Sequence, residues 1–367
     1  MNALILQHSM RKLSTIAVCI ALAGSACDRS ELECPECRIV LTRVAALTTE
    51  NPAGQALYPA TLLRHSNGTF LVGPTLVPGT VAVFDRDGTF MHSLGRYGEG
   101  PGEMREVASV NAWFGDSVAI VHDRNQFLIF SDDASAPRSG RIPSVPFIIR
   151  YLTPLPDNKV IAVRFGTGGG DDYRIREFSA LGEPGQGYGE TMPFGEGRDH
   201  VALTTAGDTV WAIRRSSYEI DAFSRTTGQL IRTVARRLDW FPPSPERNEW
   251  GGAPQIIDLA RSAPGRFWVL IRRPRPEFRL PQRPPATSGP VPASAARWGV
   301  GDEQERYEFV LELLDLNRGV PITVANLGNR VAGRFMDGDH LYGYDEDPNT
   351  GSLTIVLWHL SVANASQ

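Results

Sequence analysis

A short turn-and-strand pattern recurs six times along this chain of 367 residues. Each copy has a tight turn of Gly, Asn, Asp or Pro, then one spacer residue, then a run of β-branched, apolar and aromatic residues. The second turn residue of each copy is, in order, Gly68, Asp116, Asn158, Asp208, Gly265 and Asp339, with steps of 48, 42, 50, 57 and 74 residues between them. Such turns tolerate positive φ and join antiparallel strands, so each copy predicts a β-hairpin.

A second hairpin follows in most copies of the repeat. A strand that ends in Phe or Leu is followed by Asp or Ser and then by a glycine turn, at residues 81–88, 176–182, 222–228 and 313–319. Two hairpins in about 40–50 residues make a four-stranded unit, which is the blade of a β-propeller. Six copies therefore predict an all-β fold, a single six-bladed β-propeller, in which strands a to d of each blade are counted outward from the axis.

The last repeat is short of one strand. After residues 341–344, one further β-rich run at residues 353–360 precedes the end of the chain. Residues 39–44, near the other end, read as a strand with no hairpin partner of their own. A ring of blades must close, because an open junction leaves exposed strand edges. We therefore expect residues 39–44 to be the outer strand of the last blade, within one propeller domain over residues 38–362.

The N-terminus has the features of an export signal. Arg11 and Lys12 precede an apolar run at residues 13–23, and small residues follow up to Ala26. A basic start, a short apolar stretch and a small-residue exit predict a secretory signal peptide over residues 1–26. Cys27 directly after the small residues resembles the acylated cysteine of bacterial lipoprotein signals, which implies lipidation of Cys27 and a place in the cell envelope. Ordinary cleavage before Cys27 is the alternative, because Gly24 stands where that family has leucine.

Three cysteines remain after removal of residues 1–26: Cys27, Cys34 and Cys37. Lipidation of Cys27 would account for the odd number and would leave Cys34 and Cys37 as a pair. We expect this pair to form a disulfide in a tether over residues 27–37. A redox motif would need a helix after it, and a zinc site would need two further ligands at motif spacing.

The charge balance argues against nucleic-acid binding. The whole chain has 37 basic and 41 acidic residues, and residues 1–26 contain two of the basic ones and none of the acidic ones. The mature chain therefore has a net charge of −6, whereas a nucleic-acid-binding domain is expected to be basic. The only membrane contact expected is the lipid anchor.

A glycine-rich loop at residues 95–104, Gly-Arg-Tyr-Gly-Glu-Gly-Pro-Gly-Glu-Met, follows the glycine turn of the first repeat and a short strand. This combination resembles the NHL-type repeats of bacterial six-bladed β-propeller lipoproteins, over about residues 38–360 and best at residues 66–104. The resemblance implies the fold and export, and it implies little about activity. A phosphate-binding loop would need a helix behind it, so we expect these glycines to let the chain cross between blades.

No catalytic set is visible in the sequence. The seven histidines lack the spacing of a helical zinc site, and no Gly-x-Ser-x-Gly nucleophile elbow occurs. We therefore expect a binding or scaffold propeller that has neither catalytic activity of its own nor a cofactor. The alternative is a calcium-dependent hydrolase or lactonase with its metal in the central channel. The polar residues of the inner strands near that channel are Asn111, Thr153, Thr204, Asp258 and Arg334, and Asp258 is the one carboxylate among them.

Arginine and tryptophan gather in the segments expected at one rim of the ring, where the b–c and d–a loops lie. Counting six residues from each turn places His122, Arg164 and Arg214 there, with Arg272 nearby, and the loops add Trp240, Trp250 and Trp298. Arginine binds carboxylates and sulfates, and tryptophan offers a flat face to sugars or peptides. We therefore expect a protein, peptide or anionic glycan to bind over blades three to five.

Blade five contains a proline-rich insertion at about residues 274–305, which explains the step of 74 residues. Such a stretch has little to bury, so we expect it to be extended or mobile. It could act as a lid, as a partner-binding segment or as a tolerated surface excursion.

Overall fold

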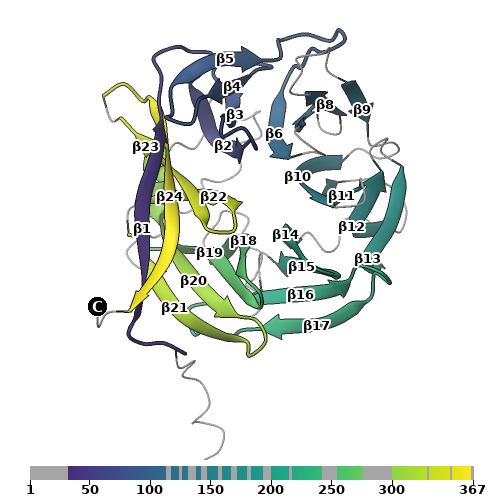
Figure 1. Cartoon of the computed structure of the whole chain (residues 1–367), viewed down its shortest axis with the longest axis vertical. Helices are drawn as coiled ribbons and strands as arrows, with labels where there is room; N and C mark the ends of the chain where they lie inside the picture. The colour runs from purple at the N-terminus through teal and green to yellow at the C-terminus, as the bar shows by residue number, and fades with distance from the viewer. Residues whose placement is uncertain are drawn as a thin grey trace, which may run out of the picture.

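The computed structural model describes residues 32–112, 117–123, 126–130, 138–141, 147–155, 159–166, 172–179, 183–192, 200–214, 217–241, 254–275, 300–328, 330–347 and 349–364. Its strands form six antiparallel sheets of four strands, arranged as six blades around one axis (Figure 1). This arrangement confirms the all-β, six-bladed propeller predicted from the repeats. The part of the chain described here contains one short helix, α2 (Val300–Arg306).

Blades one to five each use four consecutive strands, ordered a to d from the axis outward. Blade one is β2 (Ala56–Arg64), β3 (Phe70–Thr75), β4 (Val81–Phe84) and β5 (Phe90–Leu94), and blade two is β6 (Val107–Ala112), β7 (Val118–His122), β8 (Gln126–Phe130) and β9 (Arg138–Arg141). Blade three is β10 (Phe147–Leu155), β11 (Lys159–Gly166), β12 (Asp172–Ser179) and β13 (Pro184–Met192). Blade four is β14 (His200–Ala206), β15 (Thr209–Arg214), β16 (Glu219–Ser224) and β17 (Leu230–Ala235), and blade five is β18 (Gln255–Ala263), β19 (Arg266–Pro274), β20 (Tyr307–Asp315) and β21 (Val320–Asn326).

Blade six joins the two ends of the chain. Its strands are β22 (Val331–Asp337), β23 (His340–Glu346), β24 (Leu353–Asn364) and, outermost, β1 (Cys37–Leu47). β1 runs antiparallel to β24, with Cys37 opposite Asn364 and Leu47 opposite Ile355 (Figure 1). The predicted closure of the ring by residues 39–44 is confirmed, and the closing strand is longer than the sequence pattern indicated.

Glycine turns join the strands where the repeat pattern placed them. Gly68, at φ 90°, lies in the turn between β2 and β3, and Gly228, at φ 71°, lies between β16 and β17. A Cβ at Gly228 would lie 2.2 Å from the carbonyl oxygen of Gly187 on the neighbouring blade. Left-handed backbone and close approach to another chain segment both favour glycine at such a position.

The hydrophobic core lies between neighbouring blades. Every residue of β4 and of β7 is buried, which is expected for strands covered by adjacent blades on both faces. One cluster of buried side chains spans blades five, six and one, and includes Leu47 of β1, Leu62 of β2 and Leu311 of β20. The closing strand therefore contributes to the core as well as covering the edge of β24.

The glycine-rich loop at residues 95–104 crosses from β5 of blade one to β6 of blade two. Met104, which is fully buried, accepts and donates backbone hydrogen bonds with Gly98 and Arg96. A Cβ at Gly95, where φ is 79°, would lie 2.2 Å from Cε of Met104. The loop is thus a compact crossing between blades, as the sequence indicated.

The proline-rich insertion lies between β19 and β20, on the b–c side of blade five. Residues 276–299 are outside the described part of the chain, but residues 300–306 form α2 rather than the extended segment expected from composition. Val300 is buried in the cluster between blades five, six and one, and this contact holds the helix against the ring.

Candidate functional site

Four of the residues predicted for the ligand-binding rim lie at equivalent ends of the b strands. His122 ends β7, Arg214 ends β15, and Arg272 lies near the end of β19. Arg164 lies near the end of β11, although its side chain is outside the described part. Trp240 follows β17 in a d–a connection, and Trp250 and Trp298 lie outside the described residues. We call this side of the ring the loop rim, and the opposite side, with the a–b and c–d turns, the turn face.

Arg214 belongs to a polar row that crosses all four strands of blade four. Nε of Arg214 donates to Oδ2 of Asp221 over 2.9 Å, and a second guanidinium nitrogen donates to Glu219. The same Oδ2 lies 2.9 Å from Nε2 of His200, and Thr233 donates to Oδ1 over 2.6 Å. In the ladder, His200 is opposite Arg214, and Thr233 is opposite Asp221. The register of the sheet therefore assembles this cluster.

Asp221 is ionised within this row. Burial raises its pKa, but the hydrogen bonds with His200, Thr233 and Arg214 outweigh burial and bring the pKa to about 2. An unfolded aspartate ionises near pH 4, so Asp221 stabilises the fold above about pH 4. This contribution is lost as the pH falls toward the folded-state value.

A cavity of about 300 Å³ lies beside the row, between blades three and four. Blade three lines it with Tyr188, Gly189 and Glu190, and blade four lines it with His200, Arg214 and Gln229, among others. Hydrogen-bond donors and acceptors from both blades thus line one cavity, as they do in a binding site for a polar ligand. The sequence pattern pointed to Arg214 but to neither Asp221 nor His200. An acid inside the apolar strand Glu219–Ser224 was the available signal.

The other rim residues form separate clusters. Arg272 donates to Glu303 of α2 over 2.8 Å and to Gln255 over 2.7 Å, and its guanidinium lies 4.4 Å from the ring centre of Tyr307. Arg273 lies 5.0 Å from the ring centre of Trp240.

The arginines of these clusters have acidic partners. Arg214 is paired with Asp221 and Glu219, Arg272 with Glu303, and Arg273 with Glu308. His122 is also beside an acid, with Nδ1 3.0 Å from Oδ2 of Asp123. The acids offset much of the positive charge expected from the arginines alone.

The residues considered for a channel metal lie close to the axis. Asn111, Thr153, Thr204 and Asp258 line one cavity of about 320 Å³, whereas the fifth, Arg334, is not among the described residues around it. The backbone N–H of Leu152 donates to Oδ1 of Asn111, and that of Phe335 donates to Oδ2 of Asp258, over 3.2 and 3.0 Å. Both side chains therefore link the inner strand of their own blade to that of the next blade.

Asp258 has no cationic partner among these contacts. Its Oδ1 accepts the N–H of Leu259 over 2.9 Å, so backbone groups occupy both carboxyl oxygens. Burial raises the pKa of Asp258 to about 7, although both hydrogen bonds act in the opposite direction. With this pKa the carboxyl is about half protonated at neutral pH, so a cation bound there would have to displace a proton.

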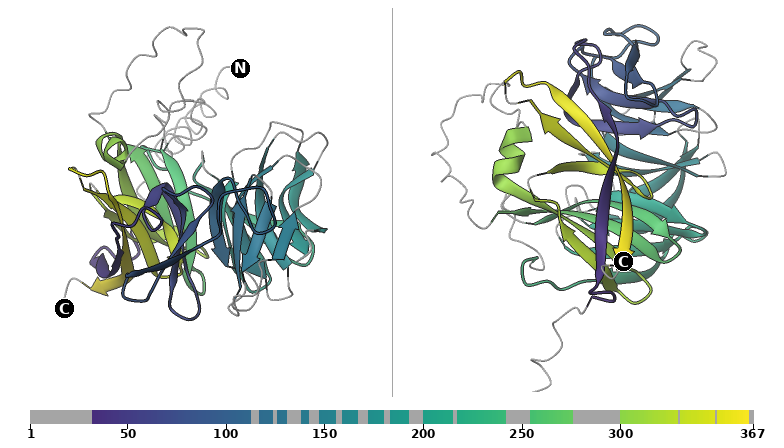
Figure 2. Two further views of the ribbon diagram at one scale, coloured as in Figure 1. Left: turned by 90° about the horizontal axis from the view of Figure 1, so that it is seen from above. Right: turned by 60° about the vertical axis from the view of Figure 1, so that its left-hand side comes forward.

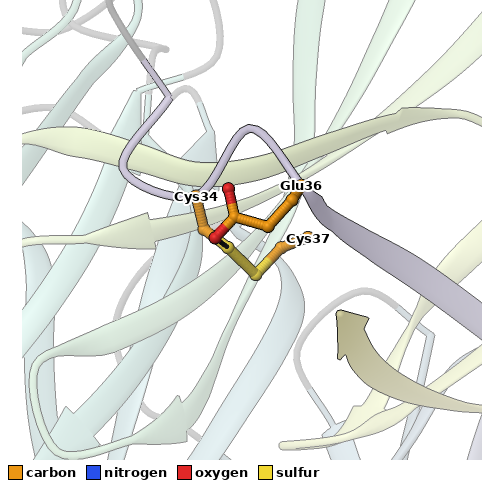
Figure 3. A group of neighbouring side chains, drawn as sticks. All are labelled: Cys34, Glu36 and Cys37. Carbon is orange, nitrogen blue, oxygen red and sulfur yellow. Dashed lines mark hydrogen bonds between the residues drawn. A yellow bond between two sulfur atoms is a disulfide. The ribbon is translucent and has the colours of Figure 1, made fainter. Parts of the chain in front are cut away.

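Cys34 and Cys37 form a disulfide with an S–S distance of 2.03 Å. The carboxylate of Glu36 folds over it, 3.1 Å from Sγ of Cys34 (Figure 3). These three residues could supply metal-ligand atoms within 4.8 Å of one another. Zinc binds thiolates, however, and the two sulfur atoms are bonded to each other here. The arrangement is that of a cross-linked turn.

Within the described residues, no helix has both the length and the apolar character that a membrane span requires.

No family model matches the sequence, and none of the curated proteins matches it. Among solved structures, a candidate exported protein of Bacteroides fragilis is 13% identical with a TM-score of 0.55, and the match covers 89% of this chain and 95% of that one. A streptogramin B lyase is 12% identical with a TM-score of 0.48, covering 88% and 98%. The Pan2 WD40 domain of Neurospora crassa is 11% identical with a TM-score of 0.45, covering 87% and 95%. At these identities the likeness concerns the fold, and the chain is a six-bladed β-propeller similar in architecture to the Bacteroides protein.

Proposed function

We propose that this protein is an exported binding or scaffold propeller, attached to a membrane by a lipid on Cys27. The N-terminal sequence supports export, and the B. fragilis structure of the same fold is described as a candidate exported protein. The disulfide between Cys34 and Cys37 suits an oxidising compartment. The protein would thus belong with the NHL-type lipoproteins that its first repeat resembles.

The observation that carries the binding proposal is the cavity beside Arg214. Two carboxylates hold the guanidinium at this cavity, so less side-chain entropy is lost when it binds a ligand. His200, Glu190 and Gln229 add donors and acceptors suited to hydroxyl and amide groups. A glycan or a peptide offers such polar groups, and a carboxylate or sulfate on it would share the guanidinium of Arg214 with Asp221 and Glu219. We propose this ligand class for the loop rim over blades three to five.

The test is a binding screen on the mature protein, read by melting temperature and calorimetry. Acidic peptides and carboxylated or sulfated glycans are the probes, because a ligand that binds the folded form raises its melting temperature. Replacing Arg164 and Arg214 together by Ala should abolish the shift. Arg330→Ala, an exposed arginine between β21 and β22 on the same rim, should leave the shift unchanged.

Arg214→Lys tests the geometry of the site, since lysine keeps the charge and loses the planar fork. It should weaken binding while leaving the protein folded. Binding that survives the double alanine change would contradict the proposed site. Calcium and aryl esters belong in the same screen, because a calcium-dependent rise in melting temperature with ester turnover would instead support a hydrolase in the channel.

A further inference from the structure

The segment just before β1 is fastened to blade five. The N–H groups of Glu33 and Cys34 donate to the carbonyls of Pro321 and Ile322 on β21, over 2.9 and 3.1 Å. Nη1 of Arg318 lies 2.8 Å from Oε1 of Glu33. The chain therefore touches the ring from residue 33 onward, before it enters blade six as β1.

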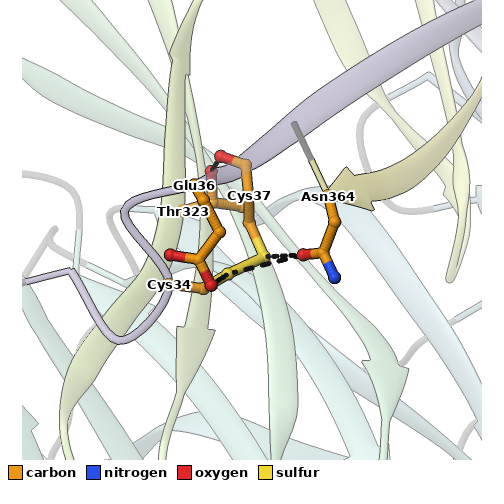
Figure 4. The surroundings of a disulfide bond; sticks show 5 residues. All are labelled: Cys34, Glu36, Cys37, Thr323 and Asn364. Atoms are coloured by element: carbon orange, nitrogen blue, oxygen red, sulfur yellow. Dashed lines mark hydrogen bonds between the residues drawn. A yellow bond between two sulfur atoms is a disulfide. The ribbon is translucent and has the colours of Figure 1, made fainter. Parts of the chain in front are cut away.

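The disulfide lies where this segment bends into β1. The hydroxyl of Thr323 donates to the carbonyl of Cys37 over 2.8 Å, and Oδ1 of Asn364 lies 3.3 Å from Sγ of Cys37 (Figure 4). Thr323 belongs to β21 of blade five and Asn364 ends β24 of blade six. The cross-linked turn thus contacts both blades, and these contacts fix the segment to the ring.

This attachment lies on the turn face. β1 begins opposite the end of β24, and Glu33 pairs with the start of β21, which follows the c–d turn of blade five. The b–c segment that contains α2 lies on the opposite side, and Figure 2 (left) shows α2 and the yellow end of β24 on opposite sides of the ring. The predicted ligand residues are therefore on the far side from the attachment point.

The covalent distance from Cys27 to Glu33 is short. Six residue steps of a fully extended chain span at most about 20 Å. A lipid on Cys27 would therefore hold the fixed point at Glu33 within about 20 Å of the anchored cysteine, whatever path residues 28–32 take.

We propose that the anchored propeller faces the membrane with its turn face at blades five and six and presents the loop rim away from it. The surface involved, which we call the tether edge, comprises the ion pair of Glu33 and Arg318 and the exposed side chains of Arg38 and Val362 where β1 begins and β24 ends. Its occupant is the headgroup layer of the membrane that carries the lipid on Cys27. This inference rests on the lipidation proposed above, and it leaves the predicted ligand residues of the loop rim on the side away from the membrane.

The test compares two labels at opposite ends of β21 in the lipidated full-length protein. Asn317→Cys places a fluorophore in the c–d turn, and Arg330→Cys places one at the loop rim; both residues are exposed. The protein is reconstituted in phosphatidylethanolamine–phosphatidylglycerol vesicles that contain an acceptor on the headgroups. Because a strand like β21 separates its ends by about 20 Å, energy transfer should be at least about twofold higher from position 317 than from position 330.

A matched variant keeps the lipid and removes the constraint. Inserting twenty Gly and Ser residues after Asp28 allows the ring to turn, so the difference between the two labels should shrink. Equal transfer from both labels in the native-length protein, or a difference that the long linker leaves intact, would overturn the orientation. Failure of the protein to associate with vesicles at all would instead contradict the lipid anchor itself.

Discussion

Single buried carboxyl groups connect neighbouring parts of this ring, and their chemistry differs from one to the next. Asp221 is surrounded by donors from three side chains and ionises readily, whereas Asp258 meets only backbone N–H groups and retains its proton to about pH 7. Glu312, at the boundary of blades four and five, is buried with Arg236 and Tyr218. The number and charge of the donors decide which acids are charged.

Asp258 makes the stability of the protein depend on pH. The folded protein holds this proton up to about pH 7, while the unfolded chain releases it near pH 4. The free energy of unfolding should therefore fall, by up to about 4 kcal/mol, as the pH rises between these values. Asp258→Asn cannot ionise and should remove this fall, so its stability relative to the unchanged protein should increase with pH.

Urea unfolding at pH 5 and pH 8 checks this prediction. Asn at position 258 can still accept the N–H of Phe335 with Oδ1. Its NH2 group would face the N–H of Leu259, donor against donor, and the resulting loss in free energy of unfolding is the same at both pH values. Asp345→Asn, at an exposed acid of β23, is the control and should keep the original slope. Parallel curves for Asp258→Asn and the unchanged protein would contradict the prediction.

At the scale of the element, β1 combines an exposed outer surface with a buried end. Val44 is 49% exposed, whereas Leu47 is 2% exposed and belongs to the cluster that spans blades five, six and one. The two side chains are three residues apart on one strand. Substitutions at these two positions therefore distinguish what side-chain burial and what strand pairing contribute to the free energy of unfolding.

Leu47→Ala should lower the free energy of unfolding by about 2–5 kcal/mol, because it removes buried methyl groups and leaves a cavity. Val44→Ala should change it by no more than about 0.5 kcal/mol, since an exposed side chain loses little on truncation. Chemical denaturation of both variants provides the measurement. A similar loss for the two would mean that the end of β1 is not anchored in the core.

At the scale of the whole molecule, the ring is closed by strand pairing between the ends of the chain. β24 would be an exposed edge without β1, and a long unpaired edge recruits other chains. Both chain ends thus support one structure, and closure at the β1–β24 junction makes the six blades one unit (Figure 1).

A chain that starts after residue 47 should therefore associate through β24 and lose its single sharp unfolding transition. A chain that starts at residue 32 keeps β1 and should remain monomeric with one transition. Size-exclusion chromatography and calorimetry compare the two truncated chains. A truncated chain that stays monomeric and unfolds as sharply as the longer one would show that closure is dispensable.

The architecture could be predicted from local sequence patterns. Turn residues such as Gly68, Gly265 and Asp339 act locally, through backbone preferences that do not depend on the rest of the fold, so counting them yielded six blades. The last repeat lacks one strand, and the strand at residues 39–44 has no hairpin partner. Placing this strand in the last blade completes four strands there and closes the ring. Positions on the b strands followed from the same register, which is why His122, Arg214 and Arg272 were placed at the correct ends.

The contacts of those side chains arise from the way strands and blades pack in the folded ring. Asp221 meets Arg214 and His200 because three strands align in register, and Glu303 reaches Arg272 from a helix 31 residues further along the chain. Asn364 lies beside the disulfide of Cys34 and Cys37 although 327 residues separate it from Cys37. Such contacts depend on the relative placement of strands and blades, which no local preference encodes. The charge of the rim and the face to which the tether is fixed were therefore properties of the assembled ring.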